Sequence, residues 1–233
     1  MTQGSIGYWL QNALTNEFEK HNIAKPVISV VTQVRVDKED PSFKKPSKPI
    51  GPFYTKEEAD AEAAKDGSTY VEDAGRGYRK VVPSPMPKEI VEKEAVRALV
   101  EADVLTICSG GGGIPVVAED GQYVGVEAVN DKDFSARVLA ENVDADRLII
   151  LTGVDNIYIN YNQPDQKALE QISVAEAEEY IKEGHFAAGS MLPKIEAALD
   201  FVKGDDKRKA IITSIENLEN IDKEAGTVIS QKG

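Results

Sequence analysis

Cysteine and histidine are scarce in this sequence of 233 residues, which contains one cysteine and two histidines. The single cysteine, Cys108, cannot form a disulfide within the chain, and such usage is typical of a reducing cytoplasm. His21 and His185 lie far apart and have no ligand spacing around them, so we expect no zinc site and assign no residue as a metal ligand.

Long apolar runs and an excess of positive charge are also lacking. No run approaches the roughly 18 apolar residues of a membrane span, and MTQGSIGYWLQNALTNEFEK at residues 1–20 has no basic start or long apolar stretch of a signal peptide. The formal net charge is −13, which repels the phosphates of nucleic acids. We therefore expect a cytoplasmic protein without membrane or nucleic-acid partners, in which any phosphate is held at a specific pocket.

Apolar, β-branched segments alternate with helical patterns along the chain. The patterns predict strands over residues 26–36, 103–108, 147–153 and 209–214, and helices over residues 88–103, 133–143, 173–184 and 190–204. This alternation favours an α/β fold with a largely parallel sheet. Residues 147–153 are almost continuously apolar, which is typical of a strand covered on both faces. Ligands of such sheets bind beyond the carboxyl ends of the strands.

Residues 37–87 interrupt this alternation. They are rich in proline, lysine and glycine, with one short helical piece over residues 56–66. A connection of this length in a compact α/β fold is usually a functional lid or a small inserted subdomain.

The first segment, SIGYWLQNAL at residues 5–14, has the pattern of an amphipathic helix. The apolar face contains Ile6, Trp9, Leu10, Ala13 and Leu14. We expect this face to pack on a sheet, although a simple N-terminal helix is the alternative.

SGGGGIPVV, at residues 109–117, places four consecutive glycines directly after a predicted strand. Glycine is costly to order, so such a run suggests a backbone that comes close to something else. The commonest partner is an anion held by backbone N–H groups. A tight flexible turn is the alternative.

Three lysines stand in unusual surroundings. Lys48 is in SKPIGPF, a proline-flanked part of the predicted lid, and Lys132 lies between Asp131 and Asp133 at a helix start. Lys194, in GSMLPKIEA, is near the first turn of a helix, where the dipole disfavours a cation unless a phosphate is present. Each lysine alone could be an ordinary solvated side chain. Together with the glycine loop, the paired aspartates and the lid, they favour phosphoryl transfer.

Six segments, in order along the chain, resemble the motif series of the carbamate kinases within the amino-acid kinase family: KPIGPF, EDAGRGYRKVVPSP, SGGGGIPVV, VEAVNDKDF, LTGVDNIYINY and GSMLPKIEAAL. The resemblance implies reversible phosphoryl transfer between ATP and carbamate, giving ADP and carbamoyl phosphate, with Mg²⁺. In fermentative bacteria this reaction usually closes the arginine deiminase pathway by making ATP. The implied fold is a three-layer αβα sandwich around a mostly parallel sheet, with a protruding lid over residues 37–87, in a cytoplasmic homodimer.

By position, the resemblance also implies a catalytic set. Lys132 and Lys194 would hold the transferring phosphoryl group, and Asp133 would keep both lysines oriented and charged. Lys48 would reach from the lid onto the phosphates. The catalytic residues implied are therefore Lys48, Lys132, Asp133 and Lys194.

The resemblance implies a larger binding set as well. Its glycines would offer N–H groups to the carbamate or phosphoryl end, and its other members would form the nucleotide pocket. The set is Gly110, Gly111, Gly112, Gly113, Asp131, Thr152, Gly153, Val154, Asp155, Tyr158 and Met191. Arg76 and Arg79 are further candidates, for which a salt bridge at the base of the lid is the alternative.

Two family features are missing from the sequence: the first strand with its LGGNA-type phosphate loop, and an HGNGP-like loop. At ~30 residues per βαβ unit, this predicts that two or three segments are absent. We therefore interpret residues 1–233 as one amino-acid kinase domain that is N-terminally incomplete, and expect poor activity or none. The alternatives are another amino-acid kinase, against which the lid and SKPIGPF argue, and a non-catalytic nucleotide-binding or dimerisation remnant.

Overall fold

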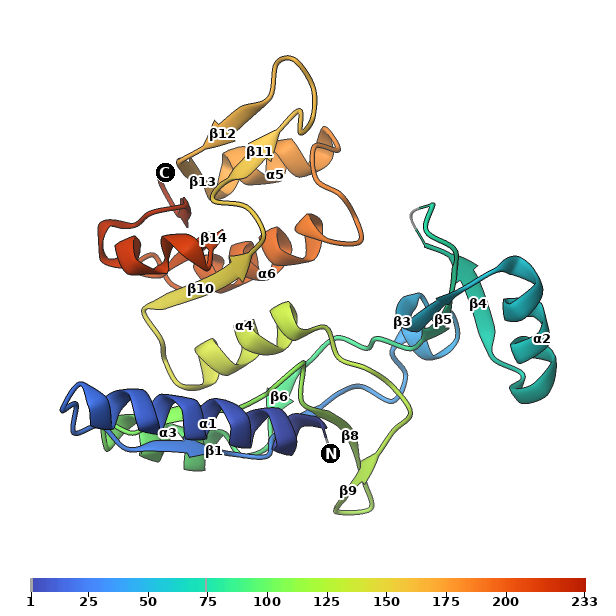
Figure 1. The fold of residues 1–233 in the computed structure, drawn as a ribbon, viewed down its shortest axis with the longest axis horizontal. Coiled ribbons are helices and arrows are strands. Elements are labelled where there is room, and N and C mark those ends of the chain that lie inside the picture. Colours follow the sequence, from blue (N-terminus) through green and yellow to red (C-terminus); the bar gives the residue numbers. More distant parts are fainter. Residues whose placement is uncertain (1, 74) are drawn as a thin grey trace. The chain divides into compact units, whose positions relative to one another are not determined.

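The computed structural model describes residues 2–73 and 75–233, so Met1 and Ala74 lie outside the described residues. The chain forms two compact units, residues 1–135 (unit 1) and residues 136–233 (unit 2). The division falls inside α4 (Lys132–Asn142) (Figure 1). The other elements of unit 1 are α1 (Thr2–Lys20), β1 (Val27–Ser29), β2 (Gln33–Arg35), η1 (Pro41–Phe43), β3 (Lys48–Tyr54), α2 (Lys56–Asp66), β4 (Thr69–Glu72), β5 (Tyr78–Val82), β6 (Glu89–Ile90), α3 (Lys93–Glu101), β7 (Leu105–Ile107), β8 (Ile114–Glu119) and β9 (Gln122–Gly125). Those of unit 2 are β10 (Arg147–Thr152), β11 (Ile157–Ile159), β12 (Lys167–Leu169), β13 (Gln171–Ser173), α5 (Val174–Lys182), α6 (Met191–Lys203), β14 (Lys209–Ser214), η2 (Glu216–Lys223) and β15 (Thr227–Ser230).

Parallel strand pairs occur in both units. In unit 1, β1 pairs with β7 and β2 pairs with β8, both in parallel, while β6 and β9 are antiparallel edge strands next to β2 and β8. In unit 2, the order β10-β14-β15-β13 contains two parallel pairs, β10 with β14 and β13 with β15. The predicted α/β class is confirmed.

The segment predicted as one strand over residues 26–36 is divided between two sheets. Its first part, β1, pairs with β7, and its second part, β2, pairs with β8. Between them, the Thr32 N–H donates to Gln3 Oε1 at 2.5 Å, and Gln3 Nε2 donates to the Thr32 carbonyl at 3.2 Å. The Thr32 carbonyl also accepts the Ile114 N–H of β8 at 2.9 Å. The side chain from α1 thus takes the Thr32 N–H, which a continuous strand would pair with a neighbouring strand.

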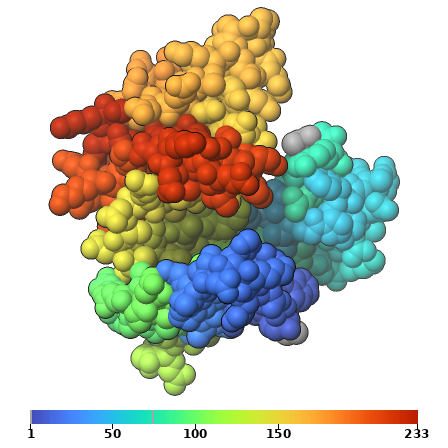
Figure 2. Space-filling view, turned by 60° about the vertical axis from the view of Figure 1, so that its left-hand side comes forward, coloured from blue at the N-terminus to red at the C-terminus, as the bar shows by residue number. Residues whose placement is uncertain are grey.

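Helix α1 packs on β1 through a different face from the one predicted. The residues turned inward follow a helical spacing of three and four, and they are Gln3, Gly7, Gln11, Leu14 and Phe18. Gly7 is buried, and a Cβ there would lie 2.1 Å from Ser29 Oγ, so this close approach requires glycine. Trp9 is 65% exposed, and Ile6 and Leu10 are also exposed. The N-terminal helix contributes to the blue surface in Figure 2. The prediction for this face was right for Leu14 and wrong for the other four residues. Polar pairing with the backbone and close approach at a glycine decide the packing.

The residues predicted to form a lid contain a small sheet and a helix of their own, and are called the lid below. Strands β3, β5 and β4 make an antiparallel sheet in that order, and α2 packs on all three (cyan in Figure 1). Helix α2 has the predicted bounds because Thr55 and Glu58 form a capping box at its start and Gly67, with φ +71°, ends it.

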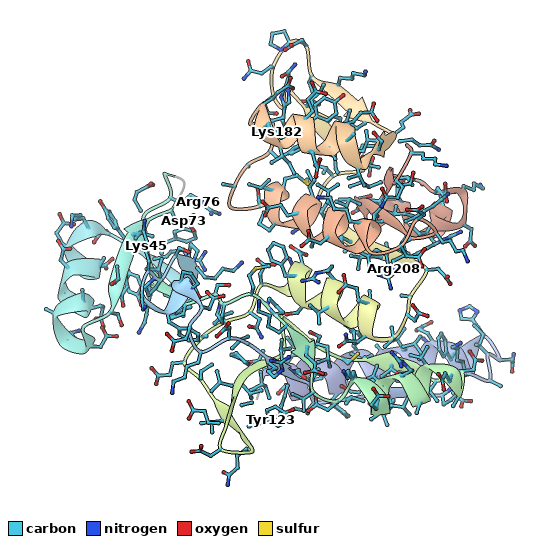
Figure 3. All side chains as sticks on the ribbon, turned by 180° about the vertical axis from the view of Figure 1, so that it is seen from behind. Lys45, Asp73, Arg76, Tyr123, Lys182 and Arg208 are labelled. Carbon is cyan, nitrogen blue, oxygen red and sulfur yellow. The ribbon has the colours of Figure 1, made fainter. Side chains whose placement is uncertain are left out.

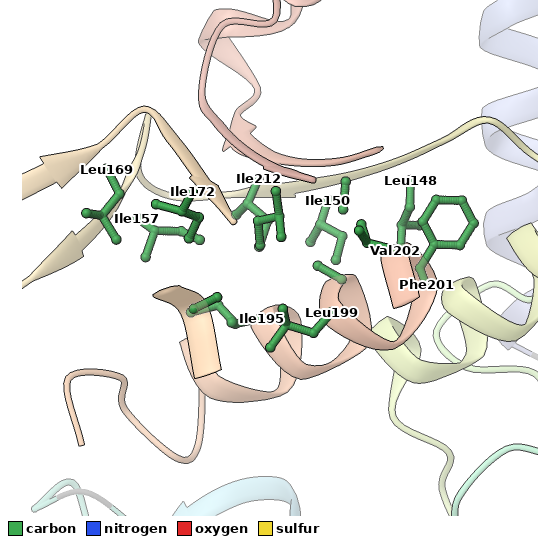
Figure 4. Packing of buried hydrophobic residues seen from close by; sticks show 14 of the residues in the cluster. Leu148, Ile150, Ile157, Leu169, Ile172, Ile195, Leu199, Phe201, Val202 and Ile212 are labelled. Atoms are coloured by element: carbon green, nitrogen blue, oxygen red, sulfur yellow. The ribbon is translucent and has the colours of Figure 1, made fainter. Parts of the chain in front are cut away.

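The core of unit 2 lies between its four-stranded sheet and α6. Ile195, Leu199 and Phe201 of α6 pack against strand residues such as Ile150 and Ile212 (Figure 4). Side chains of β10 alternate between buried and exposed, so Ile149 and Leu151 remain exposed on the other side. The prediction that both faces of this strand are covered was therefore wrong. Among the described residues, no helix has the length and apolar character of a membrane span.

Candidate active site

The glycine loop joins β7 to β8 in a compact turn. Ser109 has φ +63°, and its carbonyl accepts hydrogen bonds from the N–H groups of Gly112 at 2.8 Å and Gly113 at 2.5 Å. Its own N–H donates to Thr32 Oγ1 at 2.9 Å. Two of the four glycine N–H groups are thus used within the loop. Among the described residues, the N–H groups of Gly110 and Gly111 donate to no backbone carbonyl.

The glycine run is explained in part by contacts inside the protein. A Cβ at Gly112, where φ is +133°, would lie 2.5 Å from the Asn130 carbonyl oxygen, whereas a Cβ at Gly111 would meet no atom within 4 Å. The Gly112 carbonyl in turn accepts hydrogen bonds from Asn130 Nδ2 at 3.0 Å and from Ser135 Oγ at 2.8 Å. The loop is therefore fixed against the start of α4.

Gly112 and Gly111 provide a matched pair of alanine substitutions. We expect Gly112→Ala to destabilise unit 1 by about 1–3 kcal/mol, because φ of +133° is strained for alanine and the new Cβ collides with a backbone carbonyl. Gly111→Ala should be close to neutral in stability. Urea unfolding of the two variants measures the difference, and equal midpoints would contradict this account of the loop.

The start of α4 brings together four residues identified in the sequence. Asp131 Oδ1 accepts from the Asp133 N–H at 2.9 Å and so caps the helix. Lys132 Nζ lies 3.2 Å from both carboxylate oxygens of Asp133, whose side chain is only 7% exposed. Lys48, the first residue of β3, places Nζ 2.5 Å from Asp131 Oδ2. Lys48 and Lys132 are thus each paired with an aspartate of the same short segment.

The Asp131 carboxyl is an anion at neutral pH. Burial by itself would raise its pKa, but the hydrogen bonds from Lys48 and from the Asp133 N–H hold the pKa below its ordinary value. The carboxylate therefore keeps its charge beside Lys48.

The two candidate arginines of the lid make contacts within the lid. Arg79 Nη1 lies 3.1 Å from Asp73 Oδ2, and Arg76 Nη2 lies 3.5 Å from the same oxygen (Asp73 and Arg76 are labelled in Figure 3). Both guanidinium groups also stack on Phe53, at 4.7 Å and 5.1 Å from its ring centroid. These contacts correspond to the salt-bridge alternative considered for Arg76 and Arg79.

The remaining candidates lie in unit 2, around a cavity of about 530 Å³. Thr152 ends β10, Gly153 and Val154 follow it, Tyr158 lies in β11, and Met191 and Lys194 belong to the first turns of α6. Of the predicted residues, this cavity is lined by Thr152, Gly153, Val154, Tyr158, Met191 and Lys194. Asp155 does not line it, because its carboxylate accepts from Ser214 Oγ at 2.5 Å and joins the turn to the end of β14.

Five residues of the cavity wall were missed in the sequence, namely Tyr161, His185, Phe186, Ala187 and Ser190. The rings of Tyr158 and Tyr161 lie 5.9 Å apart, and His185 packs edge-on against Tyr180 at 5.7 Å. The segment HFAAGS, directly before a predicted helix start, was the available signal, because chain segments that enter a helix N-terminus often line anion sites.

Helix α6 begins differently from α2 and α5. Those two helices each have a capping box and an acidic residue in the first turn. At α6, Ser190 makes no side-chain capping bond, the first turn contains no acidic residue, and Lys194 follows it at the cavity. A helix N-terminus without a capping anion, next to a lysine, is suited to hold a phosphate.

The sequence profile described as the Amino acid kinase family matches residues 49–214 of the chain. The match spans more than half of the residues, so the chain belongs to the amino acid kinase family. Within this family, the chain is 57% identical to carbamate kinase 1 of Enterococcus faecium over 233 residues, which is 99% of this chain and 74% of that protein. It is 55% identical to the carbamate kinase of Lentilactobacillus hilgardii, over 100% of this chain and 73% of that protein.

The chain is also similar to solved structures of carbamate kinases. The carbamate kinase of Giardia lamblia bound to AMP-PNP has a TM-score of 0.88 and 45% identity, over 99% of this chain and 73% of that one. The same enzyme bound to citric acid has a TM-score of 0.90 and 44% identity over the same shares. The resemblance to carbamate kinase and the predicted amino-acid kinase fold are confirmed.

Proposed function

We propose that this chain catalyses reversible phosphoryl transfer between ATP and carbamate, with ADP and carbamoyl phosphate as the other pair. The structural observation that carries the proposal is the α6 N-terminus, which has no capping anion and opens on the cavity of unit 2 next to Lys194. The high identity to carbamate kinases over nearly the whole chain supports the choice of carbamate as acceptor.

In this reaction a carbamate oxygen attacks the terminal phosphorus of ATP, and the bond from that phosphorus to the bridging oxygen of ADP breaks. Carbamate is already an anion, so its oxygen needs no general base. The protein has to position the two anions and neutralise their charge. We assign this to Lys48, Lys132 and Lys194, with Asp133 orienting Lys132 through the contacts at 3.2 Å.

The nucleotide is assigned to the cavity in unit 2. Its wall combines the tyrosine pair Tyr158 and Tyr161, against which a base can stack, with the backbone turn at Gly153 and Val154. The N–H groups of Gly110 and Gly111 are the ones left to meet the carbamate or phosphoryl end. AMP-PNP in the Giardia lamblia carbamate kinase supports nucleotide binding at this fold.

Magnesium is expected to arrive with the nucleotide. Among the described residues, no group of three acidic, histidine or cysteine side chains could hold a metal ion. This fits Mg²⁺, which is commonly held by substrate phosphates and one or two carboxylates. When bound, it supplies positive charge to the phosphates. The homodimer, the cytoplasmic location and the role in arginine catabolism remain predictions from the family resemblance.

The test is a coupled assay of ATP formation from ADP and carbamoyl phosphate by the purified 233-residue chain, run beside calorimetric titration with ADP. ATP formation with carbamoyl phosphate, and none with acetyl phosphate, is the expected result. All lining residues of the cavity belong to unit 2, which favours nucleotide binding without transfer as the second candidate. Binding of ADP without ATP formation would support that candidate and overturn the kinase proposal.

A further inference from the structure

We propose that Asp131 is a positioning residue that pairs with Lys48 in the unliganded protein. When a ligand binds, its phosphoryl group displaces the Asp131 carboxylate and pairs with Lys48 instead. This inference rests on the proposed function only for the identity of the ligand. It changes the role predicted for Asp131, which then acts on Lys48 instead of on the nucleotide. The contact that carries it joins Lys48 Nζ to Asp131 Oδ2 at 2.5 Å.

The two partners of this ion pair differ in freedom. The Asp131 side chain is 14% exposed, and its second oxygen is tied to the Asp133 N–H at 2.9 Å. The Lys48 side chain is 35% exposed and has a flexible four-carbon stem. An exchange of partners therefore moves the lysine, while the carboxylate stays in place at the start of α4.

Lys38, near the start of the lid residues, pairs with Glu119 of β8. Lys48 differs from the other paired cations of the β3-β5-β4 sheet and α2. Lys56, Lys65, Arg79 and Lys80 pair with acidic residues of the lid itself. Among the described residues, the ion pair of Lys48 is the one that leads from the β3-β5-β4 sheet to α4.

This ion pair lies at the base of the lid. Lys48 stands opposite Val82 in the β3–β5 ladder. The next residue, Pro83, accepts the Val129 N–H at 3.0 Å. The lid sheet is thus tied to the segment before α4 at two neighbouring points, one of which is ionic.

A phosphoryl group competes with a carboxylate for a lysine ammonium group. It has more negative charge and three oxygen acceptors, so it can take the place of the carboxylate. The exchange forms and breaks no covalent bond. Its consequence is that ligand binding removes the ionic link between the lid and α4.

The experiment compares AMP-PNP with AMP, which lacks the outer phosphates. Calorimetric titrations in EDTA measure the affinity of each nucleotide for the unsubstituted chain and for Asp131→Asn, Lys48→Met and the double variant. Asparagine keeps an oxygen that can cap α4, so Asp131→Asn removes the charge without removing the cap. Lys80→Met is the matched control, because it removes a lid cation that pairs with Asp66 instead.

We expect Asp131→Asn to tighten AMP-PNP binding by up to about fivefold and to leave AMP binding unchanged. In the Lys48→Met background, the same substitution should change neither affinity. Equal tightening in both backgrounds would show a general field effect of the carboxylate and would overturn the proposal, as would weaker AMP-PNP binding by Asp131→Asn. Lys80→Met should bind both nucleotides as the unsubstituted chain does.

A second measurement needs no ligand and separates this inference from the proposed function. Amide hydrogen exchange of β3 should be faster in Asp131→Asn and in Lys48→Met than in the unsubstituted chain, by the same factor in both. The double variant should exchange no faster than either single variant. Additive effects, or none, would overturn the restraint of the lid. A chain that fails to bind AMP-PNP at all would refute the proposed function and the displacement step, while the exchange data would still decide whether the ion pair holds the lid.

Discussion

Replacement of Lys194 by alanine is expected to lower the rate of phosphoryl transfer about 10²–10³-fold relative to the unsubstituted chain. This is the usual loss when one preorganised charge-stabilising group is removed. Lys194 lies where the uncapped start of α6 opens on the cavity, so it adds a full positive charge to the partial charge of the helix N-terminus. Coupled-enzyme kinetics with ADP and carbamoyl phosphate measure the effect.

Two variants sharpen this test. Lys203→Ala removes a lysine from the last turn of the same helix, where Nζ lies 2.7 Å from Glu178, and should leave the rate unchanged. Lys194→Arg keeps the charge but changes its shape and reach, so we expect partial activity. The expected loss is about 10²–10³-fold. A Lys194→Ala rate within about threefold of the rate of the unsubstituted chain would therefore exclude a role in charge stabilisation.

Phe201→Ala is expected to destabilise unit 2 by about 3–5 kcal/mol, the usual cost of truncating a buried phenylalanine. Phe201 is fully buried in the core cluster of unit 2, and the Arg208 guanidinium stacks on its ring at 4.9 Å from the centroid. The substitution removes apolar burial and leaves a cavity between α6 and the sheet. Total stabilities of domains are about 5–15 kcal/mol, so the loss is a large part of the whole.

Urea unfolding measures this loss of stability, and amide hydrogen exchange in β14 and α6 measures it locally. Ile215→Ala is the control, because this side chain is 68% exposed and its truncation should change stability by less than about 0.5 kcal/mol. Phe201→Leu, which keeps part of the volume, should fall between the two. Similar unfolding midpoints for Phe201→Ala and Ile215→Ala would contradict the packing described for α6.

Local patterns in the sequence were sufficient to place several elements. Helix α2 and strand β14 have the predicted bounds, because a capping box with a terminal glycine defines the first and a short apolar run defines the second. The predicted helix over residues 88–103 is shorter in the structure, where α3 covers Lys93–Glu101. Glu89 and Ile90 pair with β2 instead, a contact over more than 50 residues that no local pattern contains.

The candidate site shows the same division. Motif order identified the family and most of the cavity residues, because each motif is a short segment whose chemistry can be recognised without its neighbours. Tyr161 and His185 became candidates only when the structure placed them on the cavity wall. The four glycines suggested a close approach, but the structure showed that Gly112 approaches the carbonyl of Asn130.

The sequence by itself determined the α/β class and the family, and it indicated the candidate lysines and the loops that follow the strands. Periodicity, capping and motif spacing are local properties of the chain. Only the tertiary structure decided that Lys48 meets Asp131 across 83 residues, that Gln3 interrupts a strand at Thr32, and which face of α1 is buried. Such contacts depend on which distant side chain or backbone group can satisfy a buried partner, and this is settled only when the segments pack together.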